Sequence, residues 1–201
     1  MGGGQSFEGD GAPSPFLFAL GVGSMKLVIE TRRLVLRPYE VRDVVAIETL
    51  ANNWNVASKL GRMPYPYERG MAAMFMADHE EKRTARLAFP FAMIRKDTFI
   101  GGIGLDLERY EDWELDYWLG EPYWGQGYAT EAALAVVGFG FETLGLERMV
   151  AGHFADNPAS GRVLAKLGFR YTGLGSRACR ARGCDVESRE MALRRADWVL
   201  S

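Results

Sequence analysis

The sequence predicts one mixed α/β domain of the α+β kind, built on a single central sheet. Short segments in which apolar and polar residues alternate recur along the chain, and segments with apolar residues at helical spacing lie between them. Their order is β-α-α-β-β-β-α-β-α-β-β. The chain shows no internal repeat and no domain-sized linker, and its 201 residues suit one domain of roughly 150–200 residues.

The first half of the chain begins with a strand and two helices. Apolar and charged residues alternate within 27–40, which indicates a strand with one solvated face. Asp43 can cap a helix that runs to about Ala51. Two prolines and a glycine make 62–70 a loop, and a second helix is expected over 71–83.

Three strands are expected next. The segments 89–94 and 99–107 are separated by Lys96 and Asp97, so they are expected to form a hairpin. The segment WELDYWL, residues 113–119, is the fourth predicted strand because its apolar and acidic residues alternate.

The remainder of the chain alternates between helices and strands. A helix is expected over 128–144, a fifth strand over 149–154 and a short helix over 157–167. Two further strands, over 169–177 and 186–193, complete the predicted sheet.

Residues 1–24 differ in composition from the rest of the chain. They contain seven glycines and two prolines but no lysine or arginine. Such a segment buries too little apolar surface to offset the entropy of ordering it. We therefore expect a disordered tail over 1–24 and the folded domain over 25–201.

The composition narrows the functional classes. A formal net charge of −2 argues against a dedicated nucleic-acid binder, which usually has a basic excess. No apolar run approaches the roughly 20 residues of a membrane span. Cys179 and Cys184 are the only cysteines, so neither a disulfide framework nor a metal site is expected. A reducing compartment, the cytoplasm, is the default.

The segment YWGQGYATEAA, residues 123–133, places Gly125 and Gly127 directly before a helix. Glycine destabilises helices, so two glycines at a helix entrance need another reason. The first N–H groups of a helix have no intrahelical partner, and the helix dipole favours negative charge there. The glycines would let phosphate oxygens approach the backbone, and Thr130 adds a hydroxyl group. The pattern favours an anion-binding turn, with a plain tight turn as the alternative.

This segment resembles the acetyl-CoA pyrophosphate loop of the GNAT superfamily of N-acetyltransferases. The superfamily pattern Q/R-x-x-G-x-G/A falls on 124–129, where a tryptophan replaces the opening Gln or Arg. That replacement is usual in the RimJ/RimL branch, which acetylates the N-termini of ribosomal proteins. A second block, ADNPASGRVLAKLGFRYTG at 155–173, is in family register, and 30–44 and 191–198 resemble the opening and closing strands of the branch. The resemblance covers about 25–200.

The resemblance implies a GNAT fold, with a mostly antiparallel sheet of about six to seven strands, splayed between the fourth and fifth and flanked by about four helices. It implies transfer of an acetyl group from acetyl-CoA to a primary amine, by direct attack in a ternary complex. Pantetheine would lie between the splayed strands like an added strand. Besides its implied role in binding the cofactor, Asn157 can cap the helix that it opens. The implied cofactor-binding residues are Trp118, Leu119, Trp124, Gly125, Gln126, Gly127, Tyr128, Ala129, Thr130, Asn157 and Ser160.

Three residues are candidates for proton transfer. Glu114 matches the Glu of the fourth strand in this branch and is the leading base. Asp116 stands where the branch commonly has glycine, and is a second base or an anchor for the substrate amine. The tyrosine that protonates the leaving thiolate in many relatives is replaced by Leu164, so Ser160 takes that role, as in RimL-type enzymes. The alternatives are a solvated strand face for the two carboxylates and an ordinary first-turn residue for Ser160.

The sequence does not fix the acceptor. The leading hypothesis is the N-terminus of a protein or peptide, such as a ribosomal protein. A small amine (a polyamine, an amino acid or an aminoglycoside) and a non-catalytic acetyl-CoA-binding module are the alternatives. A monomer and a homodimer are both open. Three arginines within 176–183 are interpreted as part of a solvated loop.

Overall fold

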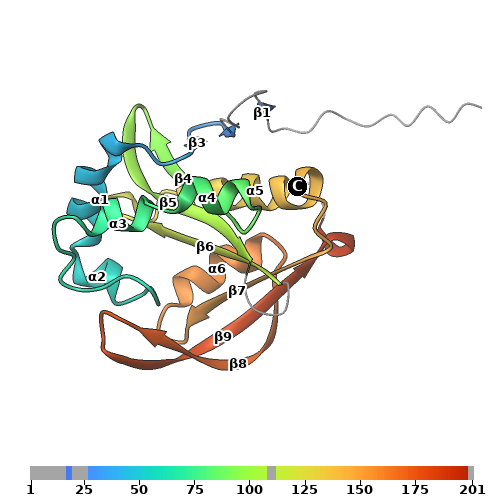
Figure 1. The fold of residues 1–201 in the computed structure, drawn as a ribbon. Helices are drawn as coiled ribbons and strands as arrows, with labels where there is room; N and C mark the ends of the chain where they lie inside the picture. Colours follow the sequence, from blue (N-terminus) through green and yellow to red (C-terminus); the bar gives the residue numbers. More distant parts are fainter. Residues whose placement is uncertain (1–16, 20–26, 108–111, 199–201) are drawn as a thin grey trace, which may run out of the picture.

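The computed structural model describes residues 17–19, 27–107 and 112–198, and its strands form one sheet (Figure 1). The sheet has nine strands in the order β1-β2-β3-β4-β5-β6-β7-β9-β8. The strands are β1 (Leu17–Ala19), β2 (Val28–Glu30), β3 (Val35–Arg37), β4 (Ala88–Arg95), β5 (Thr98–Leu107), β6 (Trp113–Leu119), β7 (Arg148–Phe154), β8 (Arg170–Cys179) and β9 (Cys184–Arg194).

All neighbouring strands are antiparallel except β6 and β7, which are parallel. This confirms the predicted mixed, mostly antiparallel sheet. The structure has nine strands instead of the six to seven expected, partly because the predicted strand over 27–40 is divided. A turn in which Thr31 N donates to Leu34 O at 2.9 Å separates β2 from β3.

The strand β1 belongs to the segment 1–24 for which we expect a tail. Leu17–Ala19 pair with β2, so these three residues differ from that expectation. The other residues of 1–24 lie outside the described residues, and the tail and the domain boundary stay predictions.

Six α-helices lie beside the sheet among the described residues, compared with the four expected. The predicted helix over 71–83 is two helices, because the backbone leaves helical geometry at Asp78 (φ −106°, ψ 3°). The helices are α1 (Val44–Ala51), α2 (Trp54–Ala57), α3 (Met71–Met76), α4 (His79–Thr84), α5 (Tyr128–Gly138) and α6 (Pro158–Lys166); helical turns cover Val41–Asp43, Glu121–Tyr123, Phe139–Thr143 and Arg195–Asp197.

The helix expected over 128–144 changes its geometry within that range. The α-helical part, α5, ends at Gly138, and a π-helical turn continues to Thr143. Gly140 in this turn packs tightly against β7, since a Cβ at Gly140 would lie 2.9 Å from Met149 Cε.

The sheet buries two apolar clusters on its two faces. The larger cluster packs α5 and α6 against the strands and includes Leu164, and the smaller packs α1 and α3 and includes Ile47. Residues of β6 alternate between the two faces, as in any strand. Leu115 and Tyr117 contact the larger cluster, whereas Trp118 contacts the smaller one.

The strands β6 and β7 are joined only at their beginnings. Trp113 pairs with Met149 and Glu114 pairs with Val150, although β6 continues to Leu119. Figure 1 shows the two strands separating beyond these pairs. The predicted splay between the fourth and fifth predicted strands is confirmed.

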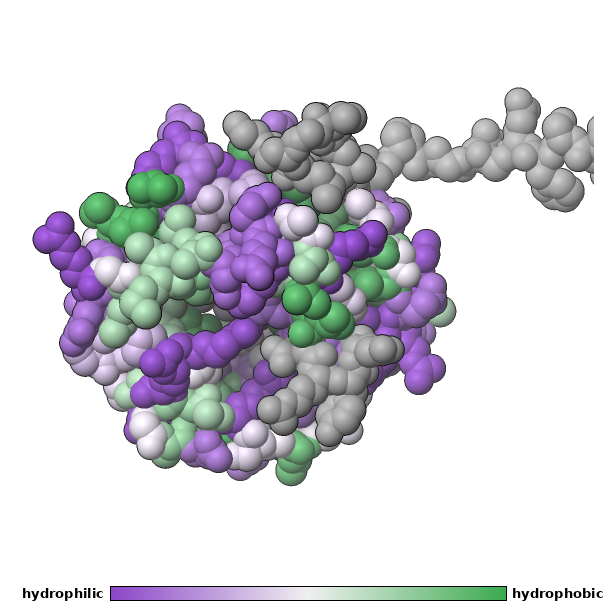
Figure 2. Space-filling model, viewed as in Figure 1, coloured by the Kyte–Doolittle hydropathy of each residue, from purple (hydrophilic) through white to green (hydrophobic). Residues whose placement is uncertain are grey.

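The face shown in Figure 2 is mostly hydrophilic over α4, whose sequence is HEEKRT. Apolar side chains gather on the same face in the region of α1 and α3, where Val45 and Met74 are exposed. Along the described part of the chain, no helix is long and apolar enough to cross a membrane.

Candidate active site

The glycine-bearing turn lies where β6 has ended and α5 begins, next to the splay. Gly125 has φ +73° and Gly127 has φ +81°, a left-handed conformation that favours glycine. A Cβ at Gly125 would meet no atom within 4 Å, so this side of the turn is open. The conformation explains both glycines, and the open space leaves the backbone accessible.

The N-terminus of α5 can hold an anionic group. Gly127 is its N-cap and supplies no side-chain cap, and the first intrahelical bond runs from Glu131 N to Gly127 O at 3.1 Å. The N–H groups of Tyr128, Ala129 and Thr130 precede that bond, so they have no carbonyl partner within the helix. The helix dipole adds partial positive charge at the same place.

Arg33 from the β2–β3 connection and Glu131 from α5 brace this turn. The Glu131 carboxylate accepts from Thr31 Oγ1 (2.7 Å), Arg33 N (2.7 Å) and Arg33 Nε (2.6 Å). Arg33 Nη1 donates to Gln126 O at 2.9 Å, and the guanidinium lies 4.5 Å from the Tyr128 ring centroid. Burial would raise the pKa of Glu131, but the hydrogen bonds and the charge of Arg33 outweigh it and hold the pKa below its usual value.

Trp124 and Gln126 stabilise the turn through their side chains. Trp124 Nε1 donates to Leu119 O at 2.8 Å, and Gln126 Nε2 donates to Pro122 O at 3.0 Å. Because the Leu119 carbonyl is engaged, a backbone hydrogen bond from Leu119 to a ligand would come most readily from its N–H. The Trp118 indole packs in the smaller apolar cluster, with its ring centroid 5.9 Å from that of Phe99.

Asn157 and Ser160 lie at the N-terminus of α6. Asn157 is the N-cap, and its Oδ1 accepts from Ser160 N at 3.4 Å, so the capping alternative holds. The Ser160 hydroxyl lies 2.8 Å from the hydroxyl of Tyr117, which comes from β6. Leu164 is 1% exposed and belongs to the larger apolar cluster, so it is a core residue.

Glu114 is held by an ion pair that crosses the sheet. Arg177 Nη1 donates to Glu114 Oε1, and Nε of the same guanidinium donates to Glu190 Oε1 at 2.9 Å. Gly152 on β7 makes room for this side chain, since a Cβ there would lie 2.5 Å from Arg177 Nη2. The interpretation of 176–183 as a solvated loop is wrong for Arg177, which lies in β8.

Asp116 belongs to a second group of charges on the same strand face as Glu114. Arg62 Nη2 donates to Asp116 Oδ2 at 2.7 Å and to Asp106 Oδ2 at 2.6 Å. Desolvation by the surrounding protein, followed by the charge of Asp106, raises the pKa of Asp116 well above its usual value, and Arg62 opposes the shift. The side chain keeps 45% of its surface accessible, so this desolvation is partial. A carboxyl group with a raised pKa, reachable by solvent, suits proton transfer near neutral pH.

The candidate residues therefore fall into two groups on opposite faces of β6. Glu114 and Asp116 share one face by their spacing of two, and Tyr117 lies on the other face with Ser160. The splay of β6 from β7 is the opening between the two groups.

Four residues of this region were not among the sequence candidates: Arg33, Arg62, Tyr117 and Arg177. Tyr117 lies in the matched block. It follows Glu114 by three residues in the same strand, and this odd spacing places the two side chains on opposite faces of the sheet. The three arginines show no local signal for this region, because each meets one of its carboxylates (Glu131, Asp106 and Asp116, or Glu114) across the fold, 44 to 98 residues away in sequence.

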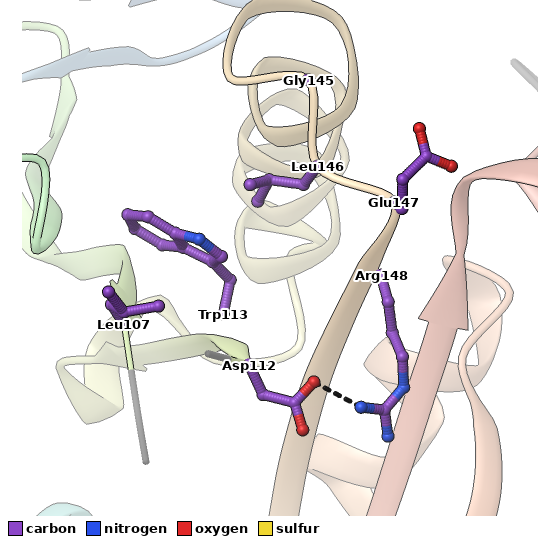
Figure 3. A pocket seen from close by; sticks show the side chains of 7 residues that line it. All are labelled: Leu107, Asp112, Trp113, Gly145, Leu146, Glu147 and Arg148. Atoms are coloured by element: carbon purple, nitrogen blue, oxygen red, sulfur yellow. Dashed lines mark hydrogen bonds and ion pairs between the residues drawn. The ribbon is translucent and has the colours of Figure 1, made fainter. Parts of the chain in front are cut away.

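A hollow of about 510 Å³ lies at the other end of β6 from the glycine turn (Figure 3). Leu107, Trp113 and Leu146 line it, and Arg148 pairs with Asp112 at its edge. It contains none of the sequence candidates, so it is separate from the region described above.

Comparison with known proteins gives one family and several similar structures. The model of the acetyltransferase (GNAT) domain matches residues 33–170. YoaA of Bacillus subtilis, an uncharacterized N-acetyltransferase, is 34% identical over 154 residues, which cover 73% of this chain and 85% of YoaA.

Two solved structures share the fold at low sequence identity. Mycobacterium smegmatis RimJ, in complex with a CoA disulfide, gives a TM-score of 0.74 at 21% identity over 84% of this chain and 85% of RimJ. RimL, the ribosomal L7/L12 alpha-N-protein acetyltransferase in complex with coenzyme A, gives 0.75 at 19% identity over 83% of this chain and 97% of RimL.

Proposed function

The chain belongs to the GNAT family of acetyltransferases, and we propose that it moves the acetyl group of acetyl-CoA to the N-terminal amine of a protein or peptide. The observation that carries this proposal is the open glycine turn at the N-terminus of α5, next to the splayed strands. It supplies backbone N–H groups and a helix dipole for a pyrophosphate, beside a gap that can take an extended pantetheine arm.

The cofactor is supported by chemistry and by relatives. In the proposed complex, Gln126 to Thr130 hold the pyrophosphate through backbone N–H groups, and Trp118, Leu119 and Asn157 line the path of pantetheine. Trp124, Gly125 and Gly127 shape the turn. RimJ was solved with a CoA disulfide and RimL with coenzyme A, which agrees with this assignment.

The acceptor is supported by RimL, which acts on a ribosomal protein N-terminus, and by the carboxylates near the gap. An α-amino group has a pKa of about 7.7–8.0, so a modest base deprotonates it. Glu114 or Asp116 accepts that proton, directly or through water. The neutral nitrogen then forms a bond to the acetyl carbonyl carbon, and the bond from that carbon to sulfur breaks. The leaving thiolate takes a proton from Ser160, and the second proton that the nitrogen loses as the amide forms returns to Ser160, directly or through water.

A thiol-release assay with matched acceptors tests the proposal. One peptide has a free N-terminus and no lysine, a second has a blocked N-terminus and one lysine, and a polyamine represents small amines. We expect release with the first peptide, and mass spectrometry should place the acetyl group on its α-nitrogen. Release with the polyamine alone would favour the small-amine alternative, and coenzyme A binding without release would favour a non-catalytic module.

A pair of glycine variants tests the cofactor turn. Gly127→Val places a side chain where the phosphate must approach, and Gly145→Val is its control. Gly145 has a similar φ of +72°, so both variants carry similar backbone strain. A Cβ at Gly145 meets no atom within 4 Å, and a Cβ at Gly127 makes only one ordinary van der Waals contact, 3.4 Å from Arg33 Nη2. Calorimetry should show a loss of coenzyme A affinity of about tenfold or more for Gly127→Val only. Equal affinity in the two folded variants would remove the anion-binding turn from the proposal.

A further inference from the structure

Tyr117 is the side chain that reaches Ser160 from β6. Its ring packs against the larger apolar cluster, and its hydroxyl lies 2.8 Å from Ser160 Oγ and 3.1 Å from Ser160 O. The contact joins the unpaired part of β6 to the first turn of α6, at the splay. It therefore lies where the proposed reaction releases its thiolate.

The backbone of Ser160 is fixed on both sides, which leaves its hydroxyl as the adjustable part. Ser160 N donates to Asn157 O at 3.2 Å and to Asn157 Oδ1 at 3.4 Å, and Ser160 O lies 3.1 Å from the Tyr117 hydroxyl. The single proton of Tyr117 has its shorter contact, 2.8 Å, with Ser160 Oγ. A serine hydroxyl has one proton that rotates to suit its surroundings. In a helix the serine hydroxyl can also donate to the carbonyl three or four residues earlier, and it then has no proton to donate to a ligand.

The two hydroxyl groups differ as donors. A phenol is a stronger acid than an aliphatic alcohol, so Tyr117 is the better donor of the pair. Burial raises the pKa of Tyr117 to about 12, against the lowering effect of Ser160, so the phenol keeps its proton at neutral pH. When Tyr117 donates to Ser160 Oγ, the Ser160 proton has to point away from the ring.

We propose that Tyr117 is a positioning residue that orients the Ser160 hydroxyl, so that Ser160 presents its proton to the leaving sulfur. The inference rests on the proposed function, because it needs Ser160 to protonate the thiolate. No bond to Tyr117 forms or breaks: the proton moves from Ser160 Oγ to sulfur, while Ser160 receives, directly or through water, the second proton that the attacking nitrogen loses, so that no alkoxide is left.

Tyr117→Phe removes the hydroxyl and keeps the ring in the core. We expect kcat to fall by about 3- to 10-fold, the value of one ordinary hydrogen bond converted to a rate, while KM for acetyl-CoA stays within about twofold. Tyr171→Phe is the matched control. Its hydroxyl contacts His153 Nε2 at 3.2 Å and would lie 2.9 Å from a Cβ at Gly161, so it also touches α6 but not Ser160.

A double variant separates positioning from other roles. If Tyr117 acts through Ser160, then Tyr117→Phe combined with Ser160→Ala should be no slower than Ser160→Ala alone. The inference is wrong if the losses in kcat of the two single variants multiply in the double variant. It is also wrong if Tyr117→Phe changes KM alone, or if Tyr171→Phe loses as much kcat as Tyr117→Phe.

Thiol release is measured with and without acceptor, since slow hydrolysis also expels the thiolate. No release from the unmodified chain would overturn the proposed function, whereas a normal rate in Tyr117→Phe would overturn only the role of Tyr117.

Discussion

Glu131 is predicted to couple the stability of the fold to the shape of the cofactor turn. Its carboxylate, whose side chain is 16% exposed, joins α5 to the β2–β3 connection through Thr31 and Arg33. Arg33 in turn holds Gln126 O. Glu131→Ala should therefore loosen the sheet edge and the glycine turn together.

The magnitude follows from the three donors that lose their acceptor. The backbone N–H of Arg33 loses a bond to a charged group, worth about 1.5 kcal/mol. The Arg33 guanidinium is 40% exposed, so its ion pair contributes only about 0.5 kcal/mol. Thr31 loses little, because its hydroxyl can donate instead to Leu34 O, which lies 3.2 Å from Thr31 Oγ1. The free energy of unfolding should fall by about 2 kcal/mol, which lowers Tm by roughly 4–8 °C in a domain of this size.

Thermal denaturation and coenzyme A calorimetry measure the two effects, with Glu147→Ala as control. The Glu147 side chain is 83% exposed, and its pair with Arg195 is 3.6 Å long, so its removal should change Tm very little. The lowered pKa of Glu131 stabilises the fold above the usual carboxyl pKa, and this stabilisation is lost as pH falls through the folded-state value. The difference between wild type and Glu131→Gln should therefore be full at pH 7 and shrink below about pH 4. A decrease in Tm for Glu131→Ala no larger than that for Glu147→Ala would refute the reasoning.

Three further predictions concern the site and the N-terminus. Asp116→Asn should raise Tm at pH 7, because the raised pKa means that the fold disfavours the charged carboxylate; an unchanged or lower Tm by thermal denaturation contradicts this. Gly152→Ala should lower kcat with normal coenzyme A affinity, because its Cβ displaces the Arg177 guanidinium that holds Glu114; a wild-type kcat would show that the ion pair is dispensable. A chain that begins at Met25 should keep its activity and lose no more than a few degrees in Tm, because it lacks only the three residues of β1 from the described sheet; a larger loss would show that residues 1–24 stabilise the domain.

Much of the fold follows from local pattern. The hairpin of β4 and β5, the helix that begins after Asn157 and the glycine turn before α5 depend on residues close together in sequence, so periodicity and turn chemistry predict them. The splay between β6 and β7 was expected only from the family resemblance.

The parts that could not be predicted depend on distant contacts or on small energy differences. Arg177 meets Glu114 because Gly152 leaves room on an intervening strand, and no pattern in the sequence signals that arrangement. The break at Asp78 divides a segment with adequate helix formers on both sides. The Asp78 side chain makes no cap hydrogen bond and pairs with Lys82 at 2.7 Å, so no capping signal marks the break. The turn between β2 and β3 is different, because the four consecutive polar residues from Glu30 to Arg33 interrupt the apolar alternation there, a signal that the prediction of one strand over 27–40 did not use.

The arrangement around β6 gives the two proton transfers of the proposed reaction separate environments. Glu114 and Asp116 lie on a face with two arginines, where charge is already paired and solvent still reaches Asp116. Tyr117 and Ser160 lie on the apolar face, where desolvation strengthens each hydrogen bond and keeps the phenol protonated. A base that receives a proton from a charged amine benefits from contact with water, whereas a donor that protonates a thiolate benefits from exclusion of water. The unpaired length of β6 would allow both, because in the proposed complex a thioester in the gap would be open to the amine from one face and to the proton donor from the other.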